Sequence, residues 1–212
     1  MRPILLVGGA PRVAVDAVRF ISVAASGATA AHLAAGLHQQ GLTADLLLGI
    51  DASPQVAAER YVDRQGLESA LKRWIQVNPT GVVVMSAAVN DYQVAQVRIE
   101  QDGGALALPP GGKLPSRAGA VTIRLEPASK IIDQLRAWGL AGPIVGFKYE
   151  AKDTVMASAV AQRLRVGAAV VVANSLCGQL QALVDERGSE QFHDRPALIA
   201  ALTARLGVLA RR

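Results

Sequence analysis

Two consecutive glycines, Gly8 and Gly9, stand where the first apolar run of the chain ends. Because glycine has no side chain, backbone N–H groups at such a turn can approach a phosphate closely, although tight turns also need glycine for conformational reasons. The Gly-x-Gly-x-x-Gly dinucleotide pattern is absent, and Leu46–Gly49 occupies the strand end where a ribose-binding acid would stand. The glycine pair is therefore compatible with a phosphate site and argues against an NAD-dependent dehydrogenase.

The segment from Asp16 to Gly27 places a hydroxyl, a glycine and an arginine just before a predicted helix. Ser26-Gly27 opens that helix and Arg19 lies close behind, an arrangement that suits a bound carboxylate or phosphate. The structural alternative is a helix cap at Ser26 with an ion pair between Arg19 and Asp16. The segment by itself does not decide between these two interpretations.

Two further turns carry residues suited to a nucleotide. The small residues Ser86-Ala87-Ala88 permit close approach of a flat ligand ring, and Asp91 could hold a hydroxyl or an amine. Lys113 ends a Pro/Gly-rich segment, where a lysine can neutralise charge that develops in phosphoryl or nucleotidyl transfer. A lysine on an exposed hairpin is more often only solubilising. Two other strand ends complete the group, with Gly146-Phe147-Lys148 and Ala173-Asn174.

The elements that would position these residues alternate between strand and helix. Buried strands are predicted at Ile4–Val7, Ala44–Leu48, Gly81–Met85, Ile144–Tyr149 and Ala169–Ala173. Helices are predicted at about 28–44, 66–77, 130–138 and 154–166, with a last helix from Pro196 to about Leu209. This alternation predicts an α/β fold with a Rossmann-like, doubly wound and mostly parallel sheet. Ligands of such sheets bind beyond the carboxyl ends of the strands, where the turns described above would lie.

Cap residues and two interruptions complete the predicted organisation. Gly41 would close the first helix, Asp153 could cap the helix from Thr154, and Asp194 would cap the last helix. Glycine-rich turns within Val94–Ser116 and Leu180–Phe192 each predict a β-hairpin or flap. Without a repeat or a low-complexity linker, residues 1–212 are expected to form a single domain that carries one inserted β-flap.

The composition limits the classes of function. Of the 212 residues 51% are hydrophobic, which is enough to form a buried core. Only 4% are aromatic, so small aliphatic side chains must fill that core, which favours a parallel sheet covered by helices. The net charge of +5 comes from scattered basic residues with few aromatics, which favours small anionic ligands over nucleic acid. The longest apolar stretch, Val166–Ala173, is too short for a membrane span. The single Cys177 excludes an internal disulfide and is expected to have no redox role, and a cytoplasmic location follows as the expectation.

Taken together and in order, these segments resemble the phosphopantothenate–cysteine ligase (phosphopantothenoylcysteine synthetase) family, the ligase domain of the DNA/pantothenate metabolism flavoproteins. The family's Asp-Pro-Val-Arg-Tyr-Ile-Ser-Asn-x-Ser-Ser-Gly pattern corresponds to Asp16–Gly27, and its Ala-Ala-Val-x-Asp-Tyr pattern to Ala87–Tyr92. Its flap Lys-Ile, Gly-Phe-x-x-Glu and Val-Ala-Asn correspond to Lys113-Leu114, Gly146–Glu150 and Val172–Asn174. The ordered matches cover nearly the whole chain.

The resemblance implies a reaction of coenzyme A biosynthesis. Members of the family activate the carboxylate of 4′-phosphopantothenate with a nucleoside triphosphate and Mg²⁺, and cysteine then attacks the acyl-nucleotidylate. Lys113 would stabilise the transferring phosphate and Arg19 would approach the acyl substrate. Nucleotide binding would fall to Gly8, Gly9, Ser86, Ala87, Ala88, Asp91, Phe147 and Lys148, and acyl-substrate binding to Ser26, Gly27 and Asn174.

The resemblance also implies partners and cofactors. Members are typically homodimers whose flap strands cross to the partner, so the flap at about 94–125 would be both interface and lid. ATP or CTP is expected as a substrate, with ATP favoured by Lys148. FMN is not expected because the chain begins at the ligase-like first strand, and a separate flavin-dependent decarboxylase would be a partner in the pathway.

Several positions depart from the family pattern. Val23 replaces an asparagine implicated in converting the acyl intermediate into product, and valine cannot form that hydrogen bond, so the second half-reaction is in question. The doubled serine is Ala25-Ser26, and the Gly-Gly-Thr-x-Glu entry ends in Arg12. Lysines of CTP-using members align with Gln162 and Val166, beside Arg163 and Arg165.

Two alternative functions remain open at this stage. A catalytically impaired paralogue that binds a nucleotide or a pantothenate-type ligand is compatible with Val23 and the missing serine. An NAD(P)-dependent oxidoreductase shares the sheet architecture, but the chain lacks both the glycine pattern and a Tyr-x-x-x-Lys pair.

Overall fold

The body of the protein is an α/β layer structure. The computed structural model describes residues 1–101, 104–117 and 119–212. In these residues one sheet has eight strands, in the order β13-β12-β11-β10-β6-β1-β4-β5. Six strands are parallel: β1 (Ile4–Gly8), β4 (Asp45–Gly49), β5 (Glu59–Tyr61), β6 (Val82–Met85), β10 (Ile144–Glu150) and β11 (Val170–Ser175). The antiparallel strands β12 (Gln181–Asp185) and β13 (Gly188–Gln191) complete one edge.

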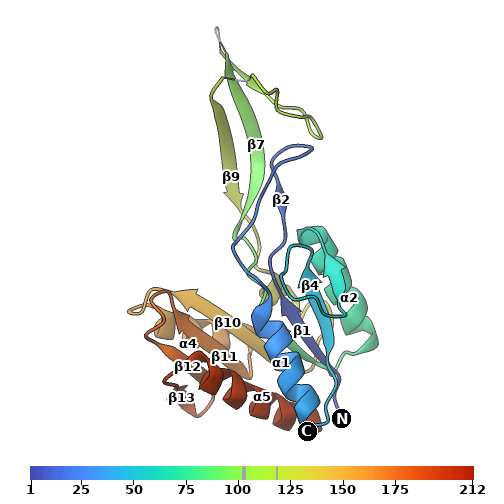
Figure 1. The fold of residues 1–212 in the computed structure, drawn as a ribbon, viewed down its shortest axis with the longest axis vertical. Coiled ribbons are helices and arrows are strands. Elements are labelled where there is room, and N and C mark those ends of the chain that lie inside the picture. Colours follow the sequence, from blue (N-terminus) through green and yellow to red (C-terminus); the bar gives the residue numbers. More distant parts are fainter. Residues whose placement is uncertain (102–103, 118) are drawn as a thin grey trace.

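Helices cover both faces of this sheet (Figure 1). The helices α1 (Ala28–Gln39) and α5 (Arg195–Arg211) bury Leu6, Val84 and Val172 beneath them. The opposite face carries α2 (Arg64–Val77), α3 (Ile131–Gln134) and α4 (Val155–Val166), over Val7, Val83 and Val171. Neighbouring residues of each strand thus enter different cores, which explains the unbroken aliphatic runs in the sequence. The predicted Rossmann-like, mostly parallel fold is confirmed.

An arm of antiparallel strands projects from the body (Figure 1). It consists of β7 (Tyr92–Gln101), β8 (Gly104–Ala107) and β9 (Val121–Pro127), paired in the order β8-β7-β9. A hairpin of β2 (Val13–Ala14) and β3 (Phe20–Ile21) lies alongside it. A small core joins the two, because Val15 of the hairpin packs on Val97, Ile99 and Leu114. The expected inserted flap is therefore present, and hereafter we call residues 92–127 the arm and residues 13–21 the hairpin.

The two ends of the chain lie together at the side of the body opposite the arm (Figure 1). The backbone N–H of Arg2 donates to the carbonyl of Ala210 at 2.7 Å. Within the described residues, no helix is long and apolar enough to cross a membrane.

Some predicted element ends were wrong. The first helix ends at Gln39 instead of about 44, because Gly41 adopts a left-handed φ of 71°. Thr154, not Asp153, is the N-cap of α4, and its hydroxyl donates back to the carbonyl of Ala151. The helix expected at 130–138 shortens to α3, and its continuation is a series of turns that ends at Gly139 with φ 98°.

Other local predictions were confirmed. Asp194 caps α5, since its carboxylate accepts the N–H of Ala197 at 2.7 Å. The segment 180–192 is a hairpin, although it extends the main sheet instead of forming a flap. The short strands β2, β3 and β5 were missed, because two or three residues are too few to show a periodic pattern.

Candidate functional site

The turn after β1 is packed against the start of α1 with almost no side chains between them. Gly9 has φ 79°, and a Cβ there would lie 2.9 Å from the nitrogen of Gly49. A Cβ at Gly8 would lie 2.9 Å from the Cβ of Ala30 on α1. The two glycines predicted from the sequence therefore permit contact between three backbone segments at the carboxyl edge of the sheet.

The N-terminus of α1 is open toward this turn. Its N-cap, Gly27, has φ 76° and supplies no capping side chain. The exposed Ser26 hydroxyl accepts only a long bond, 3.3 Å, from the N–H of Ala28. The guanidinium of Arg195 donates to the Thr29 hydroxyl and adds positive charge to the same helix end. An N-terminus of this kind favours an anionic group.

The Ser86–Ala88 segment is hydrogen-bonded to the end of β1 and to the glycine turn. The N–H of Ser86 donates to the carbonyl of Val7 at 2.9 Å, and its hydroxyl donates to the same oxygen at 2.6 Å. The N–H of Ala88 donates to the carbonyl of Gly9 at 2.9 Å. The Ser86 side chain is thus used within the protein, and small side chains remain at the strand end.

Asp91 and Lys148, both predicted to bind nucleotide, already have charged partners. Asp91 lies 3.4 Å from the amine of Lys130, and the Lys148 amine lies 3.0 Å from the carboxylate of Glu150. The pKa of Glu150 is lowered mainly because the Ser158 hydroxyl of α4 donates to it, with Lys148 adding to the effect against the opposing cost of burial. Lys148 therefore faces α4, on the sheet face opposite α1.

Phe147 and Asn174 belong to the α1 face. Phe147 packs against the core beneath α1 and α5. The side-chain oxygen of Asn174 is buried and has no hydrogen-bond partner among the described residues, and the same is true of Gln181. These two residues are directly paired on β11 and β12. Unsatisfied buried amides at a ligand edge are suited to contact a ligand.

Sequence reasoning missed Gln181 and Arg195. Gln181 lies in a predicted hairpin but becomes notable only through its pairing with Asn174, and Arg195 reaches α1 from a position 166 residues away in the chain. No local pattern in the sequence indicates either contact.

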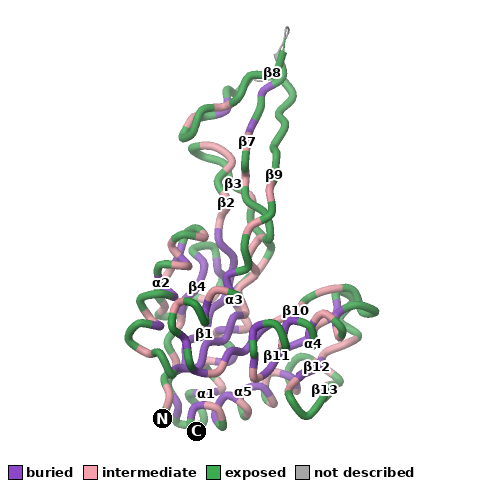
Figure 2. Tube along the Cα trace, turned by 180° about the vertical axis from the view of Figure 1, so that it is seen from behind, coloured by how far each residue is buried: buried purple, intermediate pink, exposed green. Residues whose placement is uncertain are grey.

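Arg19 and Lys113 lie apart from the sheet edge. In Figures 1 and 2 the hairpin that carries Arg19 and the arm loop that carries Lys113 both lie beyond the body, beside strands β7 and β9. Arg19 forms the ion pair with Asp16 that the structural interpretation expected. Lys113 is exposed, and its amine has no ion pair in the described part of the chain. One chain thus holds its candidate residues in two separate groups.

The positions that the resemblance aligns with lysines of CTP-using members are buried residues of α4. Gln162 and Val166 are both 7% exposed and are buried against the sheet. The Gln162 amide lies against Gly146, where an added Cβ would be 3.3 Å away. Of the neighbouring arginines, Arg165 pairs with Asp133. Neither position carries a cation, and the buried side-chain oxygen of Gln162 has no hydrogen-bond partner among the described residues.

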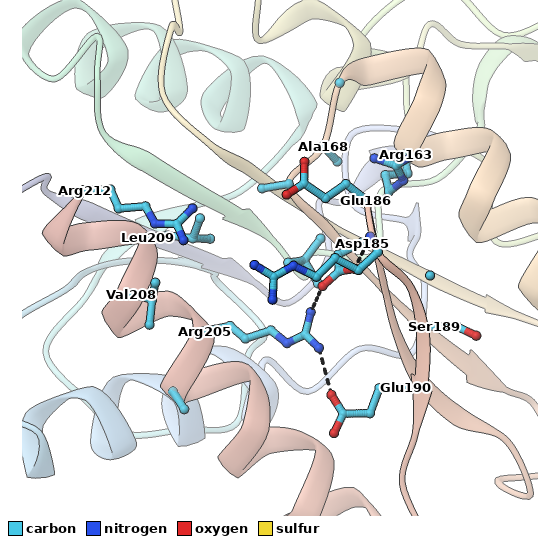
Figure 3. A pocket seen from close by; sticks show the side chains of 16 residues that line it. Arg163, Ala168, Asp185, Glu186, Ser189, Glu190, Arg205, Val208, Leu209 and Arg212 are labelled. Carbon is cyan, nitrogen blue, oxygen red and sulfur yellow. Dashed lines mark hydrogen bonds and ion pairs between the residues drawn. The ribbon is translucent and has the colours of Figure 1, made fainter.

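A cavity of about 760 Å³ lies at the opposite edge of the sheet, between α5, the end of α4 and the β12–β13 turn (Figure 3). Its central arginine, Arg205, pairs with Asp185 and, at 2.8 Å, with Glu190. One guanidinium thus bridges two carboxylates and connects α5 to β12 and β13.

The comparisons with known proteins decide the family. Residues 1–195 match the C-terminal domain of the DNA/pantothenate metabolism flavoproteins. The chain belongs to this family. It is 29% identical over 182 residues to the coenzyme A biosynthesis bifunctional protein CoaBC of Thermococcus kodakarensis, a match that covers 82% of the chain and 41% of that protein. The chain thus spans less than half the length of this curated relative.

Several solved structures share the fold of this chain. The DNA/pantothenate metabolism flavoprotein from Streptococcus pneumoniae has a TM-score of 0.80 at 17% identity, over 98% of this chain and 99% of that one. A Cab2 variant in complex with phosphopantothenate-cysteine has a TM-score of 0.78 at 14% identity, over 99% and 86%. The C-terminal domain of a CoaBC protein gives 0.72 at 19%, over 100% and 97%. At these identities the likeness concerns the fold.

Proposed function

We propose that this protein is a phosphopantothenate–cysteine ligase, a carbon–nitrogen ligase of coenzyme A biosynthesis. The observation that carries the proposal is the open N-terminus of α1, packed on the Gly8-Gly9 turn at the carboxyl edge of the sheet. Family membership, the bifunctional relative and a neighbour solved with phosphopantothenate-cysteine support it.

In the first half-reaction, a carboxylate oxygen of 4′-phosphopantothenate attacks the α-phosphorus of ATP or CTP, and pyrophosphate leaves. The Gly8-Gly9 turn, the Ser86–Ala88 segment and Phe147 would bind the nucleotide, while the α1 N-terminus would hold a substrate phosphate. Lys113 would neutralise charge on the transferring phosphate. Among the described residues no three His, Cys, Asp or Glu side chains gather as a metal site. Mg²⁺ would be held mainly by the oxygens of the triphosphate, as is usual for this ion.

In the second half-reaction, the amine of cysteine attacks the acyl carbon and the nucleoside monophosphate leaves. Val23 stands in the segment between the hairpin and α1, and its side chain offers no hydrogen bond to an intermediate. This position favours a second candidate function, a paralogue that binds the nucleotide or acyl ligand without completing the amide.

We also propose a homodimer that shares its active sites through the arm. The exposed residues Val121, Ile123 and Leu125 form an apolar stripe along β9. The hairpin with Arg19 and the arm loop with Lys113 lie beyond the body, so an arm that crosses to a partner would bring both residues to the partner's sheet edge. A cytoplasmic location and a separate flavin-dependent decarboxylase in the pathway remain parts of this proposal.

The ligase proposal is tested by pyrophosphate release from 4′-phosphopantothenate, Mg²⁺ and either nucleotide, with and without cysteine. Release with amide formation is expected. Release without amide, together with a trapped acyl-nucleotidylate, would favour the impaired paralogue, and Val23→Asn should then restore the amide. No release with either nucleotide would remove the ligase proposal.

The role of Lys113 is tested by Lys113→Gln, which removes the charge, keeps a polar end and shortens the side chain by one atom. Loss of transition-state neutralisation should slow pyrophosphate release by about 100-fold. Lys72→Gln is the matched control, because Lys72 stacks on Trp138 far from the arm. Parental activity of Lys113→Gln would show that the arm lysine is not catalytic.

The shared site is tested by mixing two inactive variants. Lys113→Gln disables the arm, and Ser26→Asp places a carboxylate where the anion would bind at α1. Activity should appear only after the two are mixed and allowed to exchange subunits, because a mixed dimer contains one intact site. If mixing restores nothing, the arm serves its own chain.

A further inference from the structure

The carboxylate of Asp16 is fully buried and is surrounded by donors from two separate segments. Its side chain is 0% exposed. One oxygen accepts the N–H groups of Val18 and Arg19, at 2.8 and 2.6 Å. The other accepts the Arg19 guanidinium and, at 2.9 Å, the N–H of Leu114 in the arm. Asp16 therefore bonds to residues on both sides of the contact between the hairpin and the arm.

Lys113 lies between the two hydrogen bonds that cross this contact. The N–H of Ala17 donates to the carbonyl of Gly112 at 3.0 Å, and the N–H of Leu114 donates to Asp16. The loop has no helix or strand from 108 to 117, and Gly111 within it has φ 70°. The position of Lys113 thus depends on residues 16 and 17 and on the buried side chain of Leu114.

The charge of Asp16 makes this connection strong. Burial would raise the pKa of a carboxyl group, but the N–H donors of Leu114, Val18 and Arg19 and the Arg19 guanidinium outweigh it and hold the pKa of Asp16 far below its usual range. Asp16 is therefore ionised at any pH near neutrality. Hydrogen bonds to an ionised acceptor are shorter and stronger than neutral ones. The hydrogen bonds of Asp16 to the hairpin and the arm therefore do not change with pH near neutrality.

We propose that Asp16 is a positioning residue, which holds the Lys113 backbone and the Arg19 guanidinium in fixed relation through one carboxylate. The proposal rests on the ligase function proposed above. Lys113 and Arg19 are distant in sequence, and both contacts with Asp16 are made by residues at or next to them. Misplacement of a catalytic group by about 1 Å can slow a reaction by about 100-fold. The hydrogen bonds of Asp16 should therefore affect the rate of nucleotidyl transfer.

Asp16→Asn is the most conservative test, because it keeps the shape and removes the charge and one acceptor. The single-turnover rate of pyrophosphate release is expected to fall by about 10- to 100-fold, with little change in the KM for the nucleotide. Asp185→Asn is the matched control, since it also breaks a carboxylate–arginine pair but at the other edge of the sheet. Its rate should stay at the parental value.

A mutant cycle separates positioning from a general loss of structure. If Asp16 acts by holding Lys113 and Arg19, adding Asp16→Asn to the variant Lys113→Gln/Arg19→Gln should slow the reaction no further. A further loss on adding Asp16→Asn would overturn the proposal, and so would a parental rate for Asp16→Asn alone.

Amide hydrogen exchange supplies a readout that needs no activity. Peptides covering 105–117 should exchange faster in Asp16→Asn, while those of α1 and β11 should not change. Unchanged exchange in the loop overturns the proposal whatever the ligase assay gives. The parent protein could release no pyrophosphate while Asp16→Asn still exchanges faster in the loop. That result would support the positioning role of Asp16 and overturn only the proposed ligase function.

Discussion

At the scale of residues, a Cβ added at Gly9 would meet the backbone of Gly49 at 2.9 and 3.2 Å, and one added at Gly8 would meet Ala30 Cβ at 2.9 Å and Leu48 Cδ2 at 3.1 Å. The backbone of Gly49 cannot move aside as the end of a flexible side chain can. The geometry of the turn is therefore set by the absence of side chains, and substitutions there should be costly for two reasons, strain and overlap.

Gly9→Ala should lower the free energy of unfolding by about 2–3 kcal/mol, because an alanine would have to adopt a left-handed φ and would also overlap Gly49. Gly41→Ala is the control. Gly41 has a similar φ of 71°, but nothing lies within 4 Å of an added Cβ, so it should lose only about 1 kcal/mol. Urea denaturation of both variants measures the difference, and equal losses would contradict the close approach at Gly9.

Tyr61→Phe should destabilise the protein by about 1 kcal/mol, because the buried Tyr61 hydroxyl donates to the carbonyl of Gly8 at 2.8 Å. Burial raises the pKa of Tyr61 above its usual 10.0. The folded state thus retains the proton that the unfolded state loses, so stability should fall as pH rises above about 10. The free energy of unfolding, measured by urea denaturation from pH 8 to 11, should show this fall in the parent. Tyr149→Phe, a control at an exposed tyrosine, should show the same fall, and Tyr61→Phe a weaker one.

At the scale of elements, Arg205 connects α5 to the β12–β13 hairpin through two carboxylates (Figure 3). Arg205→Met should cost about 1–2 kcal/mol, because Arg205 and Asp185 are mostly shielded from water. Arg73→Met removes the exposed pair with Glu59 and should cost at most about 0.5 kcal/mol. Thermal melts in low and high salt measure both. A larger loss for Arg73→Met would contradict this account.

Five of the six parallel strands could be predicted because they contain short aliphatic runs, whereas β5 reads Glu59-Arg60-Tyr61 and was missed. The helices could be predicted from their place between these strands and from cap residues such as Asp194. The glycine turn and Asn174 could be placed at the carboxyl edge by topology alone. The contact of Asp16 with Leu114 could not be predicted, since it joins hairpin and arm across a large part of the chain. Gln181 and Arg195 were missed for the same reason: their roles arise only from tertiary pairing.

At the scale of the whole molecule, the apolar stripe of β9 is the surface on which the proposed dimer depends. Ile123→Asp should yield a monomer, because a carboxylate would be desolvated in the interface. Thr122→Asp is the control on the same strand, since neighbouring strand residues point to opposite faces. Sedimentation equilibrium gives the mass of each variant. The same mass for Ile123→Asp and the parent would contradict a dimer formed through this stripe.

The bond between Arg2 and Ala210 brings the two chain ends together, on the side of the body away from the arm and the carboxyl edge. Chains with adjacent ends tolerate circular permutation. A short glycine-serine linker could join residues 212 and 1, and new ends could open in the exposed turn at Glu186-Arg187. Every candidate residue would then keep its neighbours, while α5 would come before β1 in the chain, so that the order of synthesis could be changed without changing the site.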